Sequence, residues 1–74
     1  MSVPRIVSDP RILGGKPIIE GTRISVEVVL EELAGGATID ELARDFELTP
    51  EHIRTAIGFA AEAMSADFVF PVAS

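Results

Sequence analysis

Apolar residues along the chain change their spacing at Ser25. Before that point they occur as short pairs between proline, glycine and charged residues: Ile6-Val7, Ile12-Leu13 and Ile18-Ile19. Apolar pairs between turn-forming residues predict short β-strands. The glycines and the proline within residues 13–17 predict a tight reversal that joins strands at residues 11–13 and 17–20. Residues 1–24 are therefore predicted to form a β-hairpin segment.

After Ser25 the apolar positions recur with the period of an α-helix. Ser25 is a typical N-cap residue and Gly35-Gly36 supply a left-handed stop, so a first helix is predicted between them. Its apolar face is formed by Val26, Val29, Leu30 and Leu33. Thr38 and Glu41 have the spacing of a capping box, in which each side chain accepts a hydrogen bond from the other residue's backbone N–H. A second helix of about two turns is therefore predicted there, with Ile39, Leu42, Ala43 and Phe46 on one face.

A third helix is predicted to begin in the segment Thr49-Pro50-Glu51. A cap residue, a first-turn proline and an acid follow one another there in the order that a helix N-terminus favours. Its apolar positions have helical spacing and form one stripe, which is narrow because several of its members are alanine. The stripe consists of Ile53, Ala56, Ile57, Ala60, Ala61 and Met64. The predicted fold is mainly α, a homeodomain-like or helix-turn-helix core of three helices at 25–64 behind the hairpin segment. Residues 65–74 form an apolar tail of the same single domain, 1–74.

A domain of this size and composition can bury only a small hydrophobic core of its own. The chain has 74 residues and no cysteine, and 47% of its residues are hydrophobic. A domain of this size buries only about 60% of its unfolded surface, and without cysteine no disulfide or thiolate zinc site can stabilise it. Association with a second copy or a partner is therefore predicted. No stretch approaches the ~20 apolar residues that cross a membrane, and the N-terminus lacks a secretory signal, so we expect a cytoplasmic protein without membrane contact.

The charges are divided unevenly along the chain. The formal net charge is -6, of which residues 1–23 contribute +2 and the remainder -8. An acidic body disfavours nonspecific attraction to phosphate and favours a basic protein partner. The basic N-terminal part is expected to contact a polyanion locally through Arg5, Arg11, Lys16 and Arg23.

The chain carries few groups that could catalyse a reaction. His52 is the single histidine, and cysteine, tyrosine and tryptophan are absent. No pair of nucleophile and base is recognisable, so we expect a protein that is not an enzyme and uses no cofactor. A hard metal ion could be imagined among the carboxylates of Asp40, Glu41, Asp45 and Glu47. Their alternation with apolar residues is instead typical of a solvated helix face, and no metal site is predicted.

The third helix is where a helix-turn-helix protein places its contacts to DNA bases. The candidate DNA-contacting residues at its start and on its outer face are Thr49, His52, Arg54 and Thr55. Glu51 and Glu62 share that outer face and would be repelled by phosphate. The alternative is that this face is only solvated, and the sequence does not decide between the two.

The C-terminal apolar run holds the candidate partner-binding residues Phe68, Val69, Phe70 and Val72. One hypothesis is that they dock into a groove on another protein, by strand addition or as aromatic anchors. The alternative is that they fold back and complete the core of this chain or of a dimer. The sequence does not choose between these.

Four segments, taken in order, resemble a known protein family. They are Ser8-Asp9-Pro10, the stretch Leu-Gly-Gly-Lys-Pro-Ile-Ile-Glu-Gly-Thr-Arg-Ile-Ser-Val at 13–26, Leu33-Ala34-Gly35-Gly36, and Thr49-Pro50-Glu51-His52-Ile53. Over residues 6–62 the chain is similar to the family called domain of unknown function 433. Residues 15–23 match the family motif itself, whereas the residues of the third helix match only in kind.

The resemblance implies a homeodomain-like three-helix domain with an N-terminal β element, found in short prokaryotic proteins similar to VapB-type antitoxins. Those proteins bind a PIN-like nuclease toxin and repress their own operon. We therefore expect an antitoxin-like protein that neutralises a cognate toxin and forms a homodimer through the N-terminal β segments, with operator DNA as a further ligand. The alternative is an oligomeric protein-interaction module without DNA binding, which the acidic composition favours.

Overall fold

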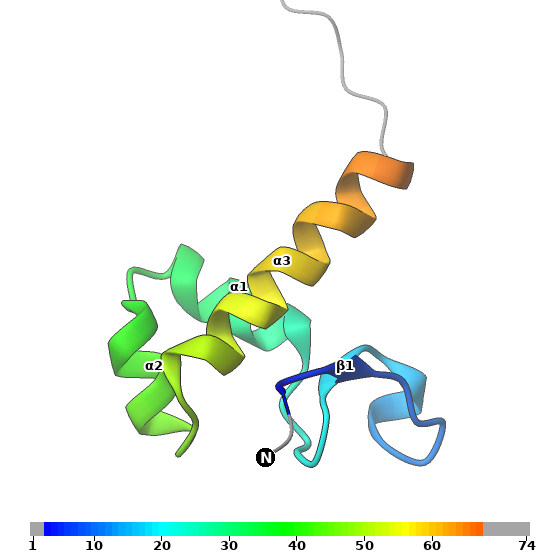
Figure 1. Cartoon of the computed structure of the whole chain (residues 1–74), viewed down its shortest axis with the longest axis horizontal. Helices are drawn as coiled ribbons and strands as arrows, with labels where there is room; N and C mark the ends of the chain where they lie inside the picture. The colour runs from blue at the N-terminus through cyan, green and yellow to red at the C-terminus, as the bar shows by residue number, and fades with distance from the viewer. Residues whose placement is uncertain (1–2, 68–74) are drawn as a thin grey trace, which may run out of the picture.

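The computed structural model describes residues 3–67. Its elements follow in the order β1 (Ile6–Val7), η1 (Leu13–Gly15), β2 (Ile18–Ile19), α1 (Val26–Ala34), α2 (Ile39–Asp45) and α3 (Pro50–Asp67). Three α-helices behind a short two-stranded sheet confirm the predicted fold class. Helix α3 packs against both α1 and α2, and its C-terminal part extends past the other elements (Figure 1).

The hairpin forms, but its two strands are not the predicted pair. Strand β1 pairs with β2 in antiparallel register, with Ile6 opposite Ile19 and Val7 opposite Ile18. The predicted strand at residues 11–13 is wrong, because the chain enters the single 3-10 turn η1 at Leu13. Leu13, Gly14 and Gly15 all have positive φ values of 51°, 65° and 87°, which two glycines permit and an extended strand does not. The reversal between the strands is therefore longer than predicted.

A second turn, after β2, fixes the hairpin to the start of α1. The Thr22 hydroxyl donates to the Ile19 carbonyl at 2.8 Å and accepts from the Ile24 N–H at 2.9 Å. Gly21 precedes it with φ 83°, a conformation that glycine adopts without strain. The chain then returns along β2, and the Val26 N–H donates to the Pro17 carbonyl at 3.0 Å. The Gly-Thr-Arg part of the motif at 15–23 thus closes a turn.

The predicted helix ends agree with the structure at most positions. The Ser25 hydroxyl accepts from the Val28 N–H at 3.0 Å, and α1 is followed by Gly36 with φ 107°. The capping box is present in both directions, since the Thr38 N–H donates to the Glu41 carboxylate at 2.8 Å and the Glu41 N–H to the Thr38 hydroxyl at 3.0 Å. Helix α3 begins at Pro50 as predicted, but it continues to Asp67, beyond its predicted end at Met64.

The core lies where the three helices and β2 meet. Its buried members are Ile18, Ile19, Val26, Val29, Leu42, Ala43, Ile53 and Ala56. Ala56 has no exposed surface, so the neighbouring elements approach α3 closely at that point. All the buried core residues of α3 lie in its first half. The second half of this helix therefore has a different environment from the first.

Candidate functional site

The N-terminal end of α3, the predicted place for DNA contacts, is held by a cap that includes the histidine. The Thr49 N–H donates to Nδ1 of His52 at 3.2 Å, and the Thr49 hydroxyl lies 2.8 Å from the same nitrogen. His52 thus occupies the place that Glu or Gln has in a capping box. The sequence predicted Thr49 as a cap residue but not the role of His52. Both side chains are engaged with each other at the start of α3.

The rest of the outer face of α3 has a mixed charge. Arg54 is exposed and, among the residues that the structure describes, makes no ion pair. The Thr55 hydroxyl donates to the Glu51 carbonyl at 2.8 Å, one turn back along the helix. Glu51 and Glu62 are exposed as expected. One cation beside two acids gives this face little attraction for phosphate.

Three of the four predicted N-terminal cations are paired with carboxylates. Arg5 lies 3.9 Å from Glu20, Arg11 lies 3.0 Å from Asp9, and Lys16 lies 2.8 Å from Glu27, in each case from side-chain nitrogen to carboxylate oxygen. The Arg11 hydrogen bond lowers the pKa of Asp9, and the Glu27 hydrogen bond raises the pKa of Lys16.

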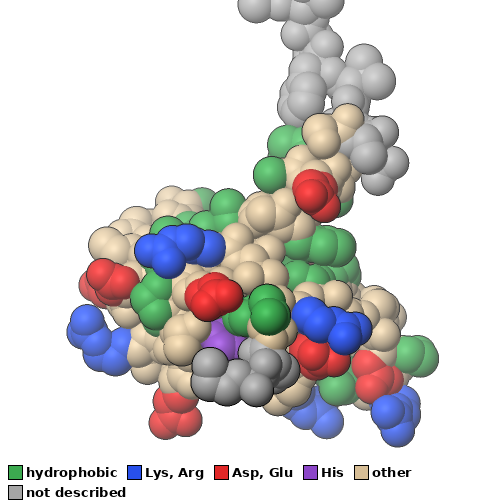
Figure 2. All heavy atoms as spheres, in the orientation of Figure 1, with side chains coloured by type: hydrophobic (Ala, Val, Ile, Leu, Met, Phe, Trp, Pro, Cys, Tyr) green, Lys and Arg blue, Asp and Glu red, His purple; other side chains and the backbone are tan. Residues whose placement is uncertain are grey.

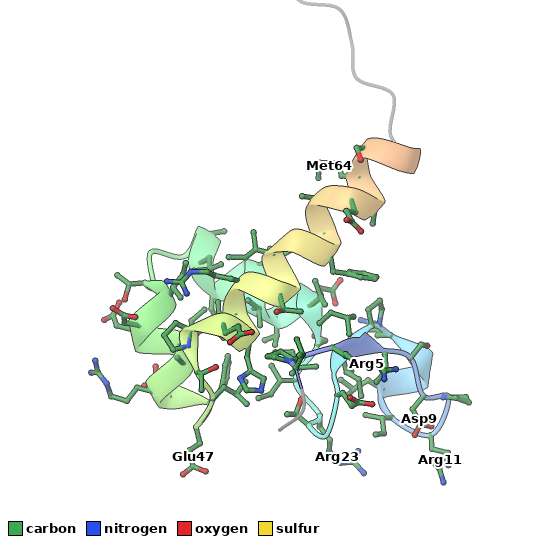
Figure 3. The ribbon with its side chains drawn as sticks, in the orientation of Figure 1. Arg5, Asp9, Arg11, Arg23, Glu47 and Met64 are labelled. Atoms are coloured by element: carbon green, nitrogen blue, oxygen red, sulfur yellow. The ribbon has the colours of Figure 1, made fainter. Side chains whose placement is uncertain are left out.

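Arg23 makes no ion pair within residues 3–67. Figure 3 shows Arg5, Arg11 and Arg23 at the hairpin end of the molecule, away from Met64. Lys16 and Arg23 line one shallow hollow of about 420 Å³ together with Leu13, Ser25 and Val28. On the face shown in Figure 2, acidic and basic side chains are interspersed and form no patch of one sign.

Metal ligands do not converge in the part of the chain that the structure describes. No group of three or more His, Asp or Glu side chains lies close enough to hold an ion there, and this includes the candidate acids Asp40, Asp45 and Glu47. None of the described helices is both long and apolar enough to span a membrane.

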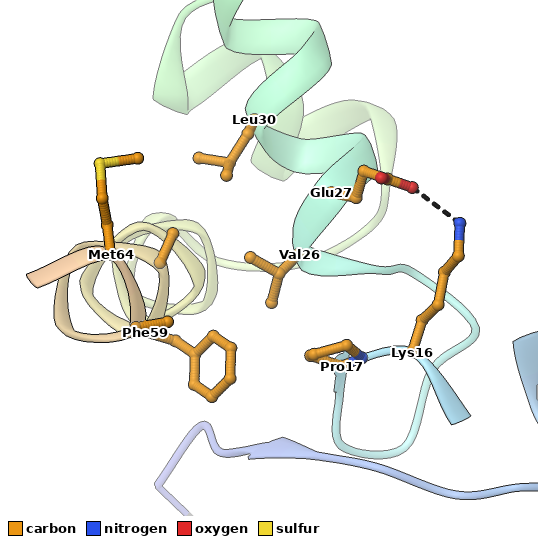
Figure 4. A pocket seen from close by; sticks show the side chains of 9 residues that line it. Lys16, Pro17, Val26, Glu27, Leu30, Phe59 and Met64 are labelled. Carbon is orange, nitrogen blue, oxygen red and sulfur yellow. Dashed lines mark hydrogen bonds and ion pairs between the residues drawn. The ribbon is translucent and has the colours of Figure 1, made fainter. Parts of the chain in front are cut away.

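An apolar groove runs between α1 and the second half of α3 (Figure 4), and we call it the α1–α3 groove. Its volume is about 480 Å³. It is lined by Lys16, Pro17, Val26, Glu27, Leu30, Phe59, Ala60, Ala63 and Met64. Leu30, Phe59 and Met64 keep 37%, 38% and 46% of their surface exposed, so the groove is open to solvent.

The groove was not predicted from the sequence. Leu30, Ala60 and Met64 do lie on the predicted apolar faces of their helices. The apolar stripe on α3 is longer than the part of it that α1 covers, because α3 extends past α1 (Figure 1). The apolar side chains beyond that part are exposed at the surface of the protein. The predicted partner-binding residues Phe68, Val69, Phe70 and Val72 lie outside the described residues.

Comparison with known proteins finds relatives of this fold. The profile of the family described as "Protein of unknown function (DUF433)" matches residues 6–60. The Mycobacterium tuberculosis (strain H37Rv) protein named "Putative antitoxin VapB45" is 38% identical over 52 residues, which are 70% of this chain and 22% of that protein. The crystal structure of Rv2018 from the same species superposes with a TM-score of 0.64 at 38% identity and covers 70% of this chain and 24% of the other. The chain thus spans less than a quarter of the length of these relatives.

Proposed function

This chain belongs to the DUF433 family, as its motif predicted, and from that membership together with the α1–α3 groove we propose that it is an antitoxin-type binding domain. It acts by holding a cognate toxin protein, not by catalysis. The observation that carries the proposal is the groove itself, because exposed apolar surface of this kind is typical of protein interaction sites. The similarity to a protein named as an antitoxin supports the choice of partner class.

The proposed toxin is a nuclease of the PIN-like class with a basic RNA-binding surface. The chain has a formal net charge of -6, and most of its acids are in the helical part that holds the groove. An acidic surface speeds encounter with a basic partner and suppresses encounter with wrong ones. Covering the RNA-binding surface of the nuclease would neutralise it.

Co-expression tests this function directly. The product of the neighbouring reading frame is expressed alone and together with this chain carrying an affinity tag. We expect arrest of growth by the neighbour alone, relief of that arrest by this chain, and capture of the neighbour on the tag. If this chain neither relieves the arrest nor captures the neighbour, the proposed toxin partner is wrong. The alternative, an oligomeric protein-interaction module, would then be favoured.

Operator DNA is a second candidate ligand, favoured by the shared hollow of Lys16 and Arg23. In this proposal the cationic hairpin end contacts phosphate, and α3 contributes only Arg54. Binding through several cations weakens steeply as salt rises from about 50 to 200 mM. We expect fluorescence anisotropy with the chain's own promoter DNA to show that dependence, and Arg23→Ala to weaken binding more than Arg44→Ala. Salt-independent binding, or equal effects of the two substitutions, would contradict it.

A further inference from the structure

The backbone around the α1–α3 groove offers no row of free hydrogen-bonding groups to an incoming strand. Both long walls are helices, whose N–H and C=O groups beyond the first turn of α1 are used inside the helix. Pro17 forms the third side, and proline has no backbone N–H. Its carbonyl already accepts from the Val26 N–H at 3.0 Å. Strand addition is therefore not available here, and an occupant must bind through its side chains.

The shape of the groove suits a helix. Ala60 and Ala63 lie on the α3 wall, with the larger Phe59 and Met64 beside them and Leu30 opposite (Figure 4). Small residues between larger ones let the axis of a third helix approach closely, as in helix pairs that pack at about 8–10 Å. Apolar side chains spaced along one face of that helix would fill the volume of about 480 Å³. This is the helix-in-groove mode of recognition.

The charges around the groove are mainly acidic. Glu27 at its edge is paired with Lys16, which neutralises that position. Glu31, one turn further along α1, is exposed and, within residues 3–67, makes no ion pair. Like charges beside Glu31 would be repelled and cations attracted. The occupant is therefore expected to carry Lys or Arg beside its apolar face.

A second copy of this chain is a poor occupant for the same reason. The second half of α3, residues 59–67, contains Glu62 and Asp67 and neither Lys nor Arg. Inserting it into the groove of another copy would bring acids toward Glu31. Helix α1 is also acidic, with three glutamates and no cation. Neither exposed helix of this chain complements the groove in charge.

We propose that the α1–α3 groove binds an amphipathic helix of the partner protein, whose apolar side chains fill the groove and whose flanking Lys or Arg side chains meet Glu31. This inference rests on the proposed function, because the helix is supplied by the toxin.

Two synthetic peptides of about 18 residues, long enough for five helical turns, test the inference on the full chain. Both carry Leu at helical spacing on one face, and they differ only in having Lys or Glu beside that face. Anisotropy measures affinity, and NMR chemical shifts locate the site. We expect the Lys peptide to bind about tenfold more tightly than the Glu peptide, and to shift the signals of Leu30, Phe59 and Met64. The substitution Glu31→Lys should reduce this preference.

Substitutions in the groove give the matched control. Leu30→Glu with Met64→Glu should weaken the Lys peptide by about tenfold or more, because a carboxylate then replaces each apolar contact. Leu13→Glu should leave its affinity unchanged, since Leu13 has the same 46% exposure as Met64 and lies outside the groove. All of these side chains are at the surface, and circular dichroism verifies that each variant folds.

Four outcomes would overturn the inference. They are equal affinity for the two peptides, no effect of the groove substitutions, self-association that those substitutions abolish, and peptide binding that strengthens when Phe68→Ser and Phe70→Ser are introduced. The third would make a second copy the occupant, and the fourth the chain's own C-terminal segment. If the toxin is captured equally by wild type and by the Leu30→Glu, Met64→Glu variant, the proposed function holds and this inference fails. If wild type captures nothing, the function itself fails.

Discussion

At the scale of single residues, the Thr22 hydroxyl is the group on which the turn after β2 depends. It bridges the Ile19 carbonyl and the Ile24 N–H in a half-buried position. Thr22→Val keeps the shape of the side chain and removes both hydrogen bonds. We expect the free energy of unfolding to fall by about 1–2 kcal/mol, because two backbone groups lose their partner. Urea denaturation measures the change.

The same substitution at Thr55 is the control. Its hydroxyl donates only to the Glu51 carbonyl within α3, and that bond adds little to a helix whose backbone is already paired. Thr55→Val should change the free energy of unfolding by less than about 0.5 kcal/mol. Equal effects at the two positions would show that the turn does not depend on the Thr22 bridge.

A second single-residue prediction concerns the pH dependence of the α2 cap. The hydrogen bond from the Thr38 N–H holds the pKa of Glu41 below its usual value. A carboxyl whose pKa is lowered in the folded state stabilises the fold above its unfolded pKa, and that stability is lost as pH falls through the folded pKa. We expect the Tm of wild type to exceed that of Glu41→Gln near neutrality and the gap to narrow in the acid range below about pH 4.3.

Thermal unfolding followed by circular dichroism at several pH values measures the Tm gap at Glu41. Glu62→Gln is its matched control, because Glu62 is an exposed glutamate in the second half of α3, far from any helix start. A gap at Glu41 that stays constant with pH would mean that the carboxylate charge contributes nothing to the cap.

Local signals allowed the caps to be predicted from sequence because each depends on residues three positions apart. Ser25, Thr38 and Thr49 were all identified in this way, and the structure places each at a helix start. The role of His52 was missed because an imidazole is not among the usual acceptors of a capping box. Its Nδ1 nevertheless accepts from the Thr49 N–H as a Glu carboxylate would.

At the scale of elements, the packing of α3 depends on the small side chain of Ala56. This residue is fully buried in the core formed by the helices and β2. Ala56→Leu should lower the free energy of unfolding by about 1–3 kcal/mol, because a well-packed core has no room for the added carbons. Ala61→Leu, on the exposed side of the same helix, should have little effect. Comparable losses in urea denaturation would contradict this packing.

The strand predicted at residues 11–13 is wrong because strand pairing depends on contacts between elements. Ile12-Leu13 and Ile6-Val7 look alike as apolar pairs next to turn residues. The choice between them depends on which pair can reach both β2 and α3, and β1 contacts α3 as well as β2. Such tertiary contacts join residues far apart in the sequence, whereas turn signals depend only on neighbouring residues. The strand pairing therefore could not be predicted from spacing alone.

At the scale of the whole molecule, the free edge of β1 bears on the expected homodimer. In the two-stranded sheet, β2 lies between β1 and the bridge to Ser25, and the outer side of β1 pairs with no strand in the described part of the chain. We predict that two such edges pair in a dimer, which leaves the α1–α3 groove open. Val3→Lys, at an exposed position beside β1, should shift the chain toward monomer, since lysine opposes edge pairing.

Sedimentation equilibrium over a range of concentrations measures this shift. Leu13→Lys, in the turn η1, adds the same charge away from the β1 edge and should leave the dimer intact. A chain that is monomeric throughout would make the dimer prediction wrong, and a dimer insensitive to Val3→Lys would place its interface elsewhere.

The groove could not be predicted because it arises only when helix lengths are compared in three dimensions. The apolar stripe of α3 was visible in the sequence, but how much of it α1 covers depends on where the two helices cross. Residues on the predicted apolar faces of the helices, such as Leu30 and Met64, are accordingly 37% and 46% exposed.

The turn closed by Thr22 also bears on how such proteins diverge. The motif at 15–23 builds a scaffold, whereas the wall of the groove runs past residue 60, where the family match ends. Under the proposed function, substitutions at Ala63 or Met64 would change the recognised helix without disturbing the turn. Two members with the same motif would then be free to recognise different partners, and a lineage could acquire a new pairing while the residues that direct folding stay unchanged.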